Sequence, residues 1–319
     1  MFWFYGLGMI VVSAVLLYIS GELLVRGLVR LSRHFQVTEF FVAFFVMAFA
    51  ASLPNVFVGV TSALQGIPEL SFGDIMGNNI IALTVAVALG VFFAPKRELP
   101  LENQTIQDTT FLTSISAILP LILISDGLIS RSDGLVLLLF FFGYVYWMFS
   151  KRDRFTRVFG EHHQSLTKEQ AMYQVARLLL GTVLLALAAQ GIVHGATLIA
   201  EGMGMSLLLV GMLIISVGGA LPEIYFTVIS ARRGETGLII GNLMGAVIIP
   251  ATFVLGIVAM IEPIENSALQ FSTTARAFLV LVAVFFLVVS QTRSVITVKE
   301  AAILFGSYIL FVLSLFFVS

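Results

Sequence analysis

Ser52-Leu53-Pro54-Asn55 is followed 168 residues later by a near copy of itself, Ala220-Leu221-Pro222-Glu223. A second stretch, Gly73-Asp74-Ile75-Met76-Gly77, recurs at the same offset as Gly241-Asn242-Leu243-Met244-Gly245. One constant offset for both stretches indicates an internal duplication. Each copy places a proline and a polar residue inside an apolar run, which in a bilayer is typical of the midplane site of a transporter.

The composition is that of an integral membrane protein. Hydrophobic residues make up 59% of the chain and charged residues 11%, and the mean hydropathy is +1.05. Soluble domains contain about 45–50% apolar and about 25% charged residues. The absence of cysteine excludes disulfides and thiolate metal sites. The Lys and Arg residues form no patch that could bind nucleic acid.

Ten apolar segments are long enough to cross a bilayer, since a helix needs about 20 apolar residues to do so. We therefore expect an all-α membrane protein with ten transmembrane helices. The first helix is expected to continue to Arg33, because its apolar residues keep helical spacing that far. The predicted spans are residues 3–20, 38–64, 73–94, 108–125, 134–150, 172–199, 206–231, 237–261, 275–291 and 300–318.

The placement of positive charge predicts the orientation. If the N-terminus lies outside, all of the 17 Lys and Arg residues except Arg131 and Arg276 fall in the cytoplasmic connections. The positive-inside rule demands this asymmetry. We therefore expect a multi-pass protein of the cell membrane with its N- and C-termini outside.

Five predicted spans precede the most polar segment of the chain and five follow it. We expect a first half at residues 1–150, a cytoplasmic linker at 151–171 and a second half at 172–319. Because each half has an odd number of spans, the two copies must lie upside down relative to each other. Inverted repeats of this kind are typical of secondary transporters.

Pro54 and Pro222 each remove a backbone donor from the middle of a span. The carbonyl groups four residues earlier, at Ala50 and Gly218, then lose their helical partners. A freed carbonyl in lipid is costly unless it is buried in protein or binds something. Proline also kinks membrane helices for packing alone. Two prolines at equivalent points of an inverted repeat favour a shared midplane site, where Gly218-Gly219 would permit close backbone approach.

Glu223 is the strongest candidate for a cation ligand. A carboxylate in mid-span is expensive unless it is paired, protonated or bound to a cation, and no Lys or Arg lies at that depth in the sequence. Asn55 occupies the equivalent position, and its amide oxygen can ligate a hard cation without adding charge. Asp74 and Asn242 are further candidates, and capping the start of a helix is an equal alternative for each. Other oxygens that could converge are those of Ser52, Asn78, Asn79, Thr84, Ser216 and Thr252.

These residues resemble the cation/Ca2+ exchanger superfamily, which includes the Na+/Ca2+ exchangers. Its members have ten spans in two inverted halves, each with a Gly-Thr-Ser-Leu-Pro-Glu-like motif followed by Gly-Asn-x-x-Gly-Ser-Asn. The resemblance covers both repeats, at about 21–90 and 189–256. It implies that Ser52 and Glu223 match ligand positions of the family, and that Asn55 stands where the family has its other acid. The departures from the pattern are Ala51, Asn78, Ala82, Gly219, Ala220, Ala246 and Pro250.

The resemblance implies a secondary active antiporter that moves Ca2+ or a related cation against Na+ or H+ by alternating access. Its partners would be inorganic cations and the lipid bilayer, with no enzyme activity and no cofactor besides the transported ions. With Glu223 and Asn55 as the metal ligands, a single carboxylate would leave bound Ca2+ with a positive net charge. Such a site would favour a monovalent ion, a proton or a weakly bound divalent ion. The alternative is a divergent member with the same fold that transports a different ion or solute.

Overall fold

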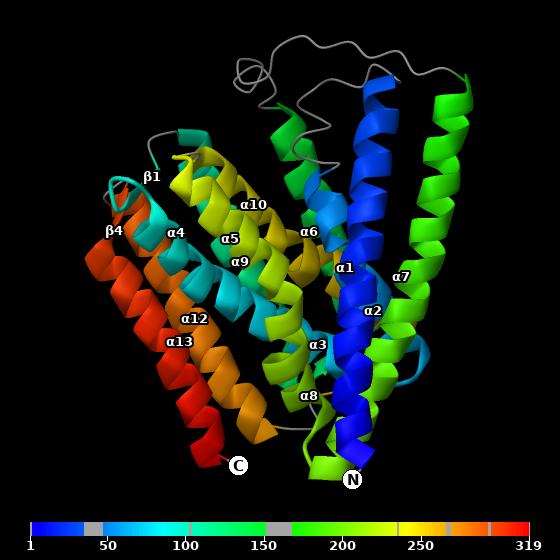
Figure 1. The fold of residues 1–319 in the computed structure, drawn as a ribbon. Helices are drawn as coiled ribbons and strands as arrows, with labels where there is room; N and C mark the ends of the chain where they lie inside the picture. The colour runs from blue at the N-terminus through cyan, green and yellow to red at the C-terminus, as the bar shows by residue number, and fades with distance from the viewer. Residues whose placement is uncertain are drawn as a thin grey trace.

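The computed structural model describes residues 2–34, 47–101, 104–150, 168–234, 236–265, 269–292 and 295–318. In these ranges the chain forms ten helical stretches and four short strands (Figure 1). The first five stretches are α1 (Phe2–His34), α2 (Met47–Leu64), α3–η2–α4 (Pro68–Ile81, Ala82–Ala86 and Val87–Phe93), α5 (Gln104–Leu123) and α6 (Arg131–Ser150). The second five are α7 (Lys168–Met203), α8–η5–α9 (Leu207–Val210, Gly211–Ile215 and Ser216–Arg232), α10–η6–α11 (Thr236–Ile248, Ile249–Val254 and Leu255–Ile261), α12 (Leu269–Thr292) and α13 (Val298–Val318). The segments η2, η5 and η6 are π-helical turns, and η3 (Ile124–Asp126) is a 3-10 turn after α5.

The boundaries of these elements repeat with the register predicted from the sequence. Moving α4 forward by 168 residues gives the bounds of α11, and moving η2 forward gives η6 without its first residue. The turn residues Gly66 and Gly234 are also 168 positions apart, and both have left-handed φ angles, of 71° and 74°. The duplication is therefore present in three dimensions as well as in the sequence.

The helices are apolar and long enough for a membrane. Seven helices of the described chain pass a test of length and composition for a membrane span, and an eighth passes if the bent pair Leu207–Leu221 and Glu223–Arg232 is one span. The helix Ser52–Leu64 is apolar but shorter, and the first part of its predicted span, residues 38–46, lies outside the described residues. The predicted all-helical membrane architecture is confirmed, and α1 continues to His34 as expected.

The start of the third span was predicted too late in the sequence. Its helix begins at Pro68, whereas the prediction placed its start at residue 73. Proline is favoured in the first turn of a helix, because the missing N–H would have no helical partner there. Gly73 and Asp74 therefore lie well inside the helix.

Helices α1 and α7 form a unit beside the other helices. Figure 1 shows them as two long antiparallel helices lying side by side. Their backbones touch where they cross, since a β-carbon on Gly6 would lie 2.7 Å from the carbonyl oxygen of Gly195. Both helices pack on α2, whereas α1 contacts α9 only sparsely and α7 contacts it at most marginally.

Two antiparallel ribbons join the remaining helices into one body. β1 (Glu98–Pro100) pairs with β4 (Val295–Thr297), and β2 (Leu128–Ile129) pairs with β3 (Ile264–Glu265). Each ribbon takes one strand from each repeat, so the two halves are tied together at both ends of the bundle.

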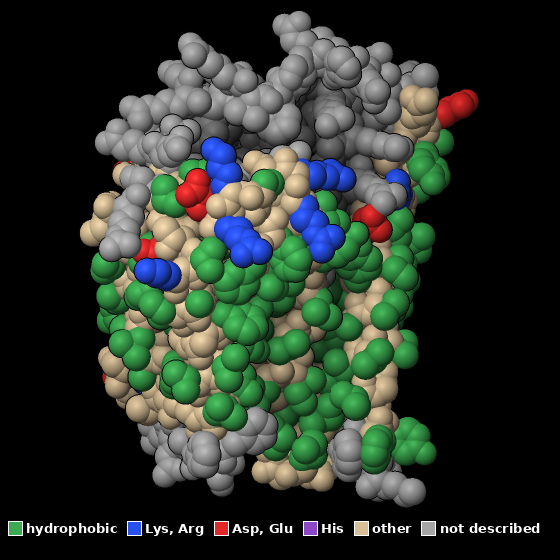
Figure 2. All heavy atoms as spheres, turned by 60° about the vertical axis from the view of Figure 1, so that its left-hand side comes forward, with side chains coloured by type: hydrophobic (Ala, Val, Ile, Leu, Met, Phe, Trp, Pro, Cys, Tyr) green, Lys and Arg blue, Asp and Glu red, His purple; other side chains and the backbone are tan. Residues whose placement is uncertain are grey.

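Basic side chains gather at one end of the molecule. Figure 2 shows Lys and Arg side chains above a broad hydrophobic surface. The guanidinium group of Arg232 lies 4.9 Å from the ring centroid of Phe93, so its charge sits at the edge of the apolar face. In the part of the chain that the structure describes, the exposed basic residues at the end that carries β1 and β4 are Lys96, Arg97, Arg232, Arg233 and Lys299.

Candidate functional site

One side of the site is formed by α3, which packs closely against α8, η5 and α9. A β-carbon on Gly73 would overlap the carbonyl group of Leu208, and one on Gly77 would overlap the carbonyl oxygen of Met212. On the other side, a β-carbon on Gly211 would lie 2.9 Å from the backbone nitrogen of Asp74. Only glycine permits this backbone contact, which brings a helix of the first repeat against a helix of the second.

Asn55 and Glu223 approach this interface from α2 and α9. Both side chains are half-buried. A β-carbon added at Gly219, one turn before Glu223, would lie 4.0 Å from Asn55 Oδ1. Asn55 of the first repeat therefore approaches α9 of the second repeat at Gly219, one turn before Glu223.

Both prolines lie inside helices that continue through them. α2 runs from Met47 to Leu64 through Pro54, with Ala50 inside it, and α9 runs from Ser216 to Arg232 through Pro222. The segments Leu207–Leu221 and Glu223–Arg232 are inclined to each other by 40°. The expected close approach at Gly218 is wrong, because a β-carbon there would meet no atom within 4 Å. Among the described residues, Gly218 therefore makes no close contact with a neighbouring helix.

In the described chain, three buried amide or carboxylate oxygen atoms in or next to the repeated motifs have no hydrogen-bond partner. They are Asn78 Oδ1, Asn79 Oδ1 and Glu223 Oε2. Asn78 and Asn79 lie in α3 and are 3% and 2% exposed. An unsatisfied buried polar atom costs about 1–3 kcal/mol. The two amide oxygens therefore require a cation or a hydrogen-bond donor such as water, and the Glu223 oxygen requires one of these or a proton.

Asp74 and Asn242 are not helix caps. Asp74 is the seventh residue of α3 and Asn242 the seventh of α10, beyond the first turn that a capping side chain serves. The cap alternative is therefore wrong for both residues. Asp74 is 4% exposed, and its backbone nitrogen lies against Gly211 of η5. The Asn242 Nδ2 atom is buried without a hydrogen-bond partner.

The predicted hydroxyl ligands are bonded within their own helices. Thr252 Oγ1 donates to the carbonyl oxygen of Ile248 at 2.6 Å. Thr84 Oγ1 donates to the equivalent carbonyl of Ile80, and Ser216 Oγ donates to that of Met212. These three oxygens keep free lone pairs but lie on helix backbones, so they rank below the amide oxygens as ligands. Ser52 is 3% exposed in α2.

Sequence reasoning missed two features of the site. The first is the set of π-helical turns, which are rare and are frequently found at functional sites; η2 and η6 continue the helices that carry Asp74 and Asn242. The second is Thr227, whose buried hydroxyl has no partner one turn after Glu223. A β-carbon on Gly90 would lie 3.3 Å from Thr227 Cγ2, so this face of α9 is turned toward α4. The helical spacing of Glu223 and Thr227 was the available signal.

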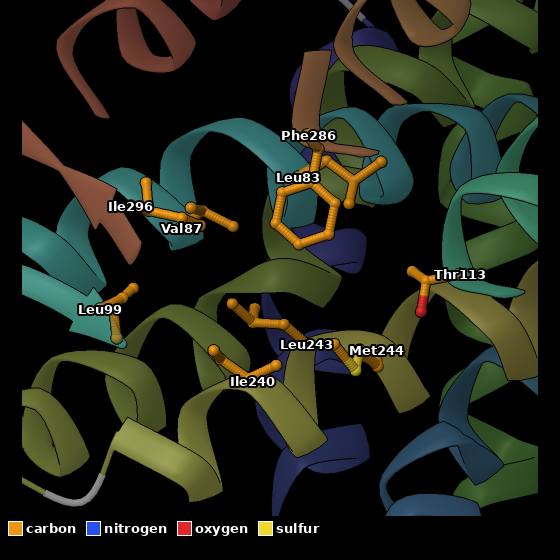
Figure 3. Close-up of a pocket in the computed structure, with 9 residues that line it drawn as sticks. All are labelled: Leu83, Val87, Leu99, Thr113, Ile240, Leu243, Met244, Phe286 and Ile296. Atoms are coloured by element: carbon orange, nitrogen blue, oxygen red, sulfur yellow. The ribbon is translucent and has the colours of Figure 1, made fainter. Parts of the chain in front are cut away.

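The internal cavity in Figure 3 is separate from the candidate cation site. It has a volume of about 10 Å3 and is lined by apolar side chains together with Thr113. A cavity of this size holds at most about one water molecule, and neither carboxyl group of the site lines it. In the described part of the chain no group of three or more His, Asp or Glu residues could hold a metal ion. A cation at the candidate site would therefore need amide and carbonyl oxygens in addition to carboxylates.

Comparison with known proteins identifies the family. The family model described as "Sodium/calcium exchanger protein" matches residues 5–150 and 173–317. The inner membrane protein YrbG of Escherichia coli is 29% identical over 329 residues, covering 98% of this chain and 97% of YrbG. The structure of the H+/Ca2+ exchanger CAX covers 98% of this chain and 82% of that chain with a TM-score of 0.77 at 19% identity. A structure of the sodium-calcium exchanger NCX_Mj, soaked with Na+ and Sr2+, covers 98% of this chain and 99% of that chain with a TM-score of 0.66 at 22% identity. The chain therefore belongs to the sodium/calcium exchanger protein family, which is a family of membrane transporters and not of enzymes.

Proposed function

We propose that the chain is a secondary active antiporter that moves Ca2+ or a related cation against Na+ or H+. The observation that carries this proposal is the buried, unpartnered Oδ1 atom of Asn78 at the contact between the two repeats, together with the buried, unpartnered Oε2 atom of Glu223. Oxygen atoms of amides and carboxylates are the ligands that Ca2+ and Na+ require. The names of the solved relatives, an H+/Ca2+ exchanger and a sodium-calcium exchanger, support the same class of substrate.

Glu223 would be the charged ligand of this site. Asn55 and Asn78 would add amide oxygens, and Ser52 with the backbone carbonyls of Ala50 and Gly218 would complete the shell. Asn79, Asn242 and Thr252 are candidates for a second layer of residues around these ligands.

Alternating access would come from movement of the α1–α7 unit against the body. The two ribbons hold the body together at both ends, while α1 and α7 pack on α2 and leave most of α9 uncovered. Because the repeats are inverted, seating the same unit on α9 would open the site to the other side of the membrane.

The proposed orientation places the basic end in the cytoplasm. Lys96, Arg97 and Arg233 lie at that end, and positive residues mark the cytoplasmic side of membrane proteins. The segment 151–171 would be a cytoplasmic linker and both termini would be outside. YrbG is an inner membrane protein by name, which supports the cell membrane as the location.

Proteoliposomes test the proposed function. The purified chain should take up Ca2+ when an outward Na+ or H+ gradient is imposed, and Glu223→Gln should abolish this uptake. The matched control is Glu262→Gln, the same substitution at an exposed residue after α11, which should leave uptake unchanged.

Two outcomes would contradict parts of the proposal. Uptake by Glu223→Gln equal to that of the unmodified chain would overturn the site. If the folded chain carried no Ca2+ under either gradient, the alternative would be favoured, namely a divergent member that transports a different ion or solute. The substitutions at Asn55, Gly219, Ala220 and Ala246 are the sequence basis for that alternative.

A further inference from the structure

Pro250 leaves one backbone carbonyl of the second repeat without its helical donor. It is the second residue of the π-helical turn η6, inside the stretch α10–η6–α11. Proline has no backbone N–H, so the carbonyl four residues earlier, at Ala246, cannot form the usual helical hydrogen bond. Pro250 is buried, and Ala246 is 7% exposed. A free carbonyl in such a place is costly unless another group donates to it.

The first repeat has no such break. Ala82 is the repeat equivalent of Pro250, and its backbone N–H donates to the carbonyl oxygen of Asn78, as in an ordinary helix. Asn78 is in turn the equivalent of Ala246. The first repeat therefore has an amide side chain and a satisfied carbonyl at this point, whereas the second has no polar side chain and a free carbonyl.

The amide of Asn78 supplies the missing donor across the contact between the repeats. Its Nδ2 atom lies 3.4 Å from the carbonyl oxygen of Ala246 and donates to it. A carbonyl oxygen can accept only from the nitrogen of an amide, so this hydrogen bond determines which way the Asn78 amide faces. Within the described chain, Oδ1 of Asn78 is left buried without a partner. The amide oxygen is therefore held away from the protein's own donors.

We infer that Pro250 is a positioning residue of the cation site and acts through Asn78. Because Pro250 lacks an N–H, the Ala246 carbonyl stays available to Nδ2, and the amide keeps Oδ1 free as a ligand. The inference rests on the proposed function, in which Asn78 supplies an amide oxygen. Three departures from the family pattern, at Asn78, Ala246 and Pro250, then belong to one arrangement.

An N–H at position 250 should disturb this arrangement. It would compete with Nδ2 of Asn78 for the Ala246 carbonyl, and the amide would then be free to turn. The amide nitrogen is a donor and cannot ligate a cation. Any population of the turned amide therefore weakens cation binding without removing a ligand from the chain.

The test measures Ca2+ binding to the purified full-length chain by isothermal titration calorimetry. Pro250→Ala restores the backbone N–H and should weaken binding roughly 3- to 10-fold, which is the effect of losing about one orienting hydrogen bond. Pro120→Ala is the matched control, because Pro120 is also a buried proline inside a helix, α5. Its binding should equal that of the unmodified chain.

A second variant separates positioning from packing. The carboxylate of Asn78→Asp has two equivalent oxygens, so it needs no hydrogen bond to select the atom that faces the ion. Adding Pro250→Ala to Asn78→Asp should therefore weaken binding no further. In the absence of cations, Pro250→Ala should unfold at the same or a higher temperature than the unmodified chain, since a proline inside a helix costs stability. A purely structural role would instead lower affinity and stability together.

The contrary results separate this inference from the proposed function. Unchanged Ca2+ binding by Pro250→Ala, beside an unmodified chain that binds, would overturn the inference alone. So would equal weakening by Pro250→Ala in the natural and the Asn78→Asp backgrounds, because the loss would then come from repacking around the missing ring. Absence of any Ca2+ binding or flux by the unmodified chain would overturn the proposed function itself, together with this inference.

Discussion

The side-chain amide of Asn78 donates a hydrogen bond to the carbonyl oxygen of Ala246, 3.4 Å away, and these two residues occupy the same position in the two repeats. A residue that contacts its own repeat equivalent must lie close to the axis that relates the repeats. At this axis Asn78 keeps its Oδ1 atom without a partner. Inverted-repeat transporters bind their cargo at the interface of the repeats, near the bilayer midplane. This contact therefore places Asn78 where an ion ligand is expected.

Replacing the Asn78 amide should weaken cation binding. Asn78→Leu keeps the approximate volume of the side chain and removes both the oxygen and the donor. Loss of one coordinating oxygen is expected to cost about 1–2 kcal/mol, or roughly 10-fold in affinity. The measurement is Ca2+ titration of the purified protein, with thermal unfolding as the check on folding.

Asn78→Asp separates the two functions of the amide. This variant keeps an oxygen at the Oδ1 position but loses the donor to Ala246, so binding should persist. If Asn78→Leu bound Ca2+ as tightly as the unmodified chain, Asn78 would not be a ligand and its unpartnered oxygen would have another explanation.

The backbone contact between the repeats should tolerate no side chain. Gly73→Ala would push a β-carbon into the carbonyl group of Leu208. Overpacking of this kind typically costs about 1–3 kcal/mol, so the variant should unfold at a lower temperature in detergent. Gly143→Ala in α6 is the matched control, because no atom lies within 4 Å of its β-carbon. Equal unfolding temperatures for the two variants would show that α3 and α8 are further apart than described.

Cysteine labelling can decide the orientation, because the natural chain has no cysteine. Lys96 and Glu262 are exposed and lie at opposite ends of the bundle. A thiol reagent that cannot cross the membrane should label Glu262→Cys on intact cells. It should label Lys96→Cys only after the membrane is permeabilised. The opposite pattern would mean that the basic end faces outward.

Much of the fold could be predicted because membrane helices have few alternatives. Every backbone polar group must be satisfied in lipid, so apolar runs become helices. The constant offset, which also separates Pro54 from Pro222, then identified the two halves as repeats of each other. The start of α3 was misplaced because Pro68 and Glu69 look like a loop in sequence, although the first turn of a helix accepts both.

The chemistry of the site was harder to predict because it depends on contacts between the repeats. Glu223 could be identified alone, since a carboxylate in an apolar run is costly wherever it points. The burial of Asp74 against η5 could not be predicted from sequence, because the close packing of α3 on this stretch arises from glycines that also have other uses. The π-helical turns have no sequence signal that distinguishes them from ordinary helix. The expected close approach at Gly218 was wrong because α1 and α7 cover α2 instead of α9.

That asymmetry between α2 and α9 predicts a second conformation. A β-carbon on Gly21 of α1 would lie 3.7 Å from Pro54 Cγ on α2, and the repeat equivalents of these two residues are Ala189 on α7 and Pro222 on α9. In the other access state the second pair should come into contact. The double variant Gly21→Cys with Pro54→Cys should therefore form a disulfide in the present state, while Ala189→Cys with Pro222→Cys should do so only when cation gradients drive turnover.

Each disulfide should stop transport. A reducing agent should restore transport, so every sample serves as its own control for the effect of the substitutions. Single-cysteine variants give the flux expected without a link. If α1 and α7 move against the body during transport, both disulfides should block exchange, because each disulfide holds the α1–α7 unit in one of its two positions. Continued Ca2+ flux through protein with a complete Gly21–Pro54 link would show that this unit stays in place during transport, and that access alternates through the bend at Pro222 instead.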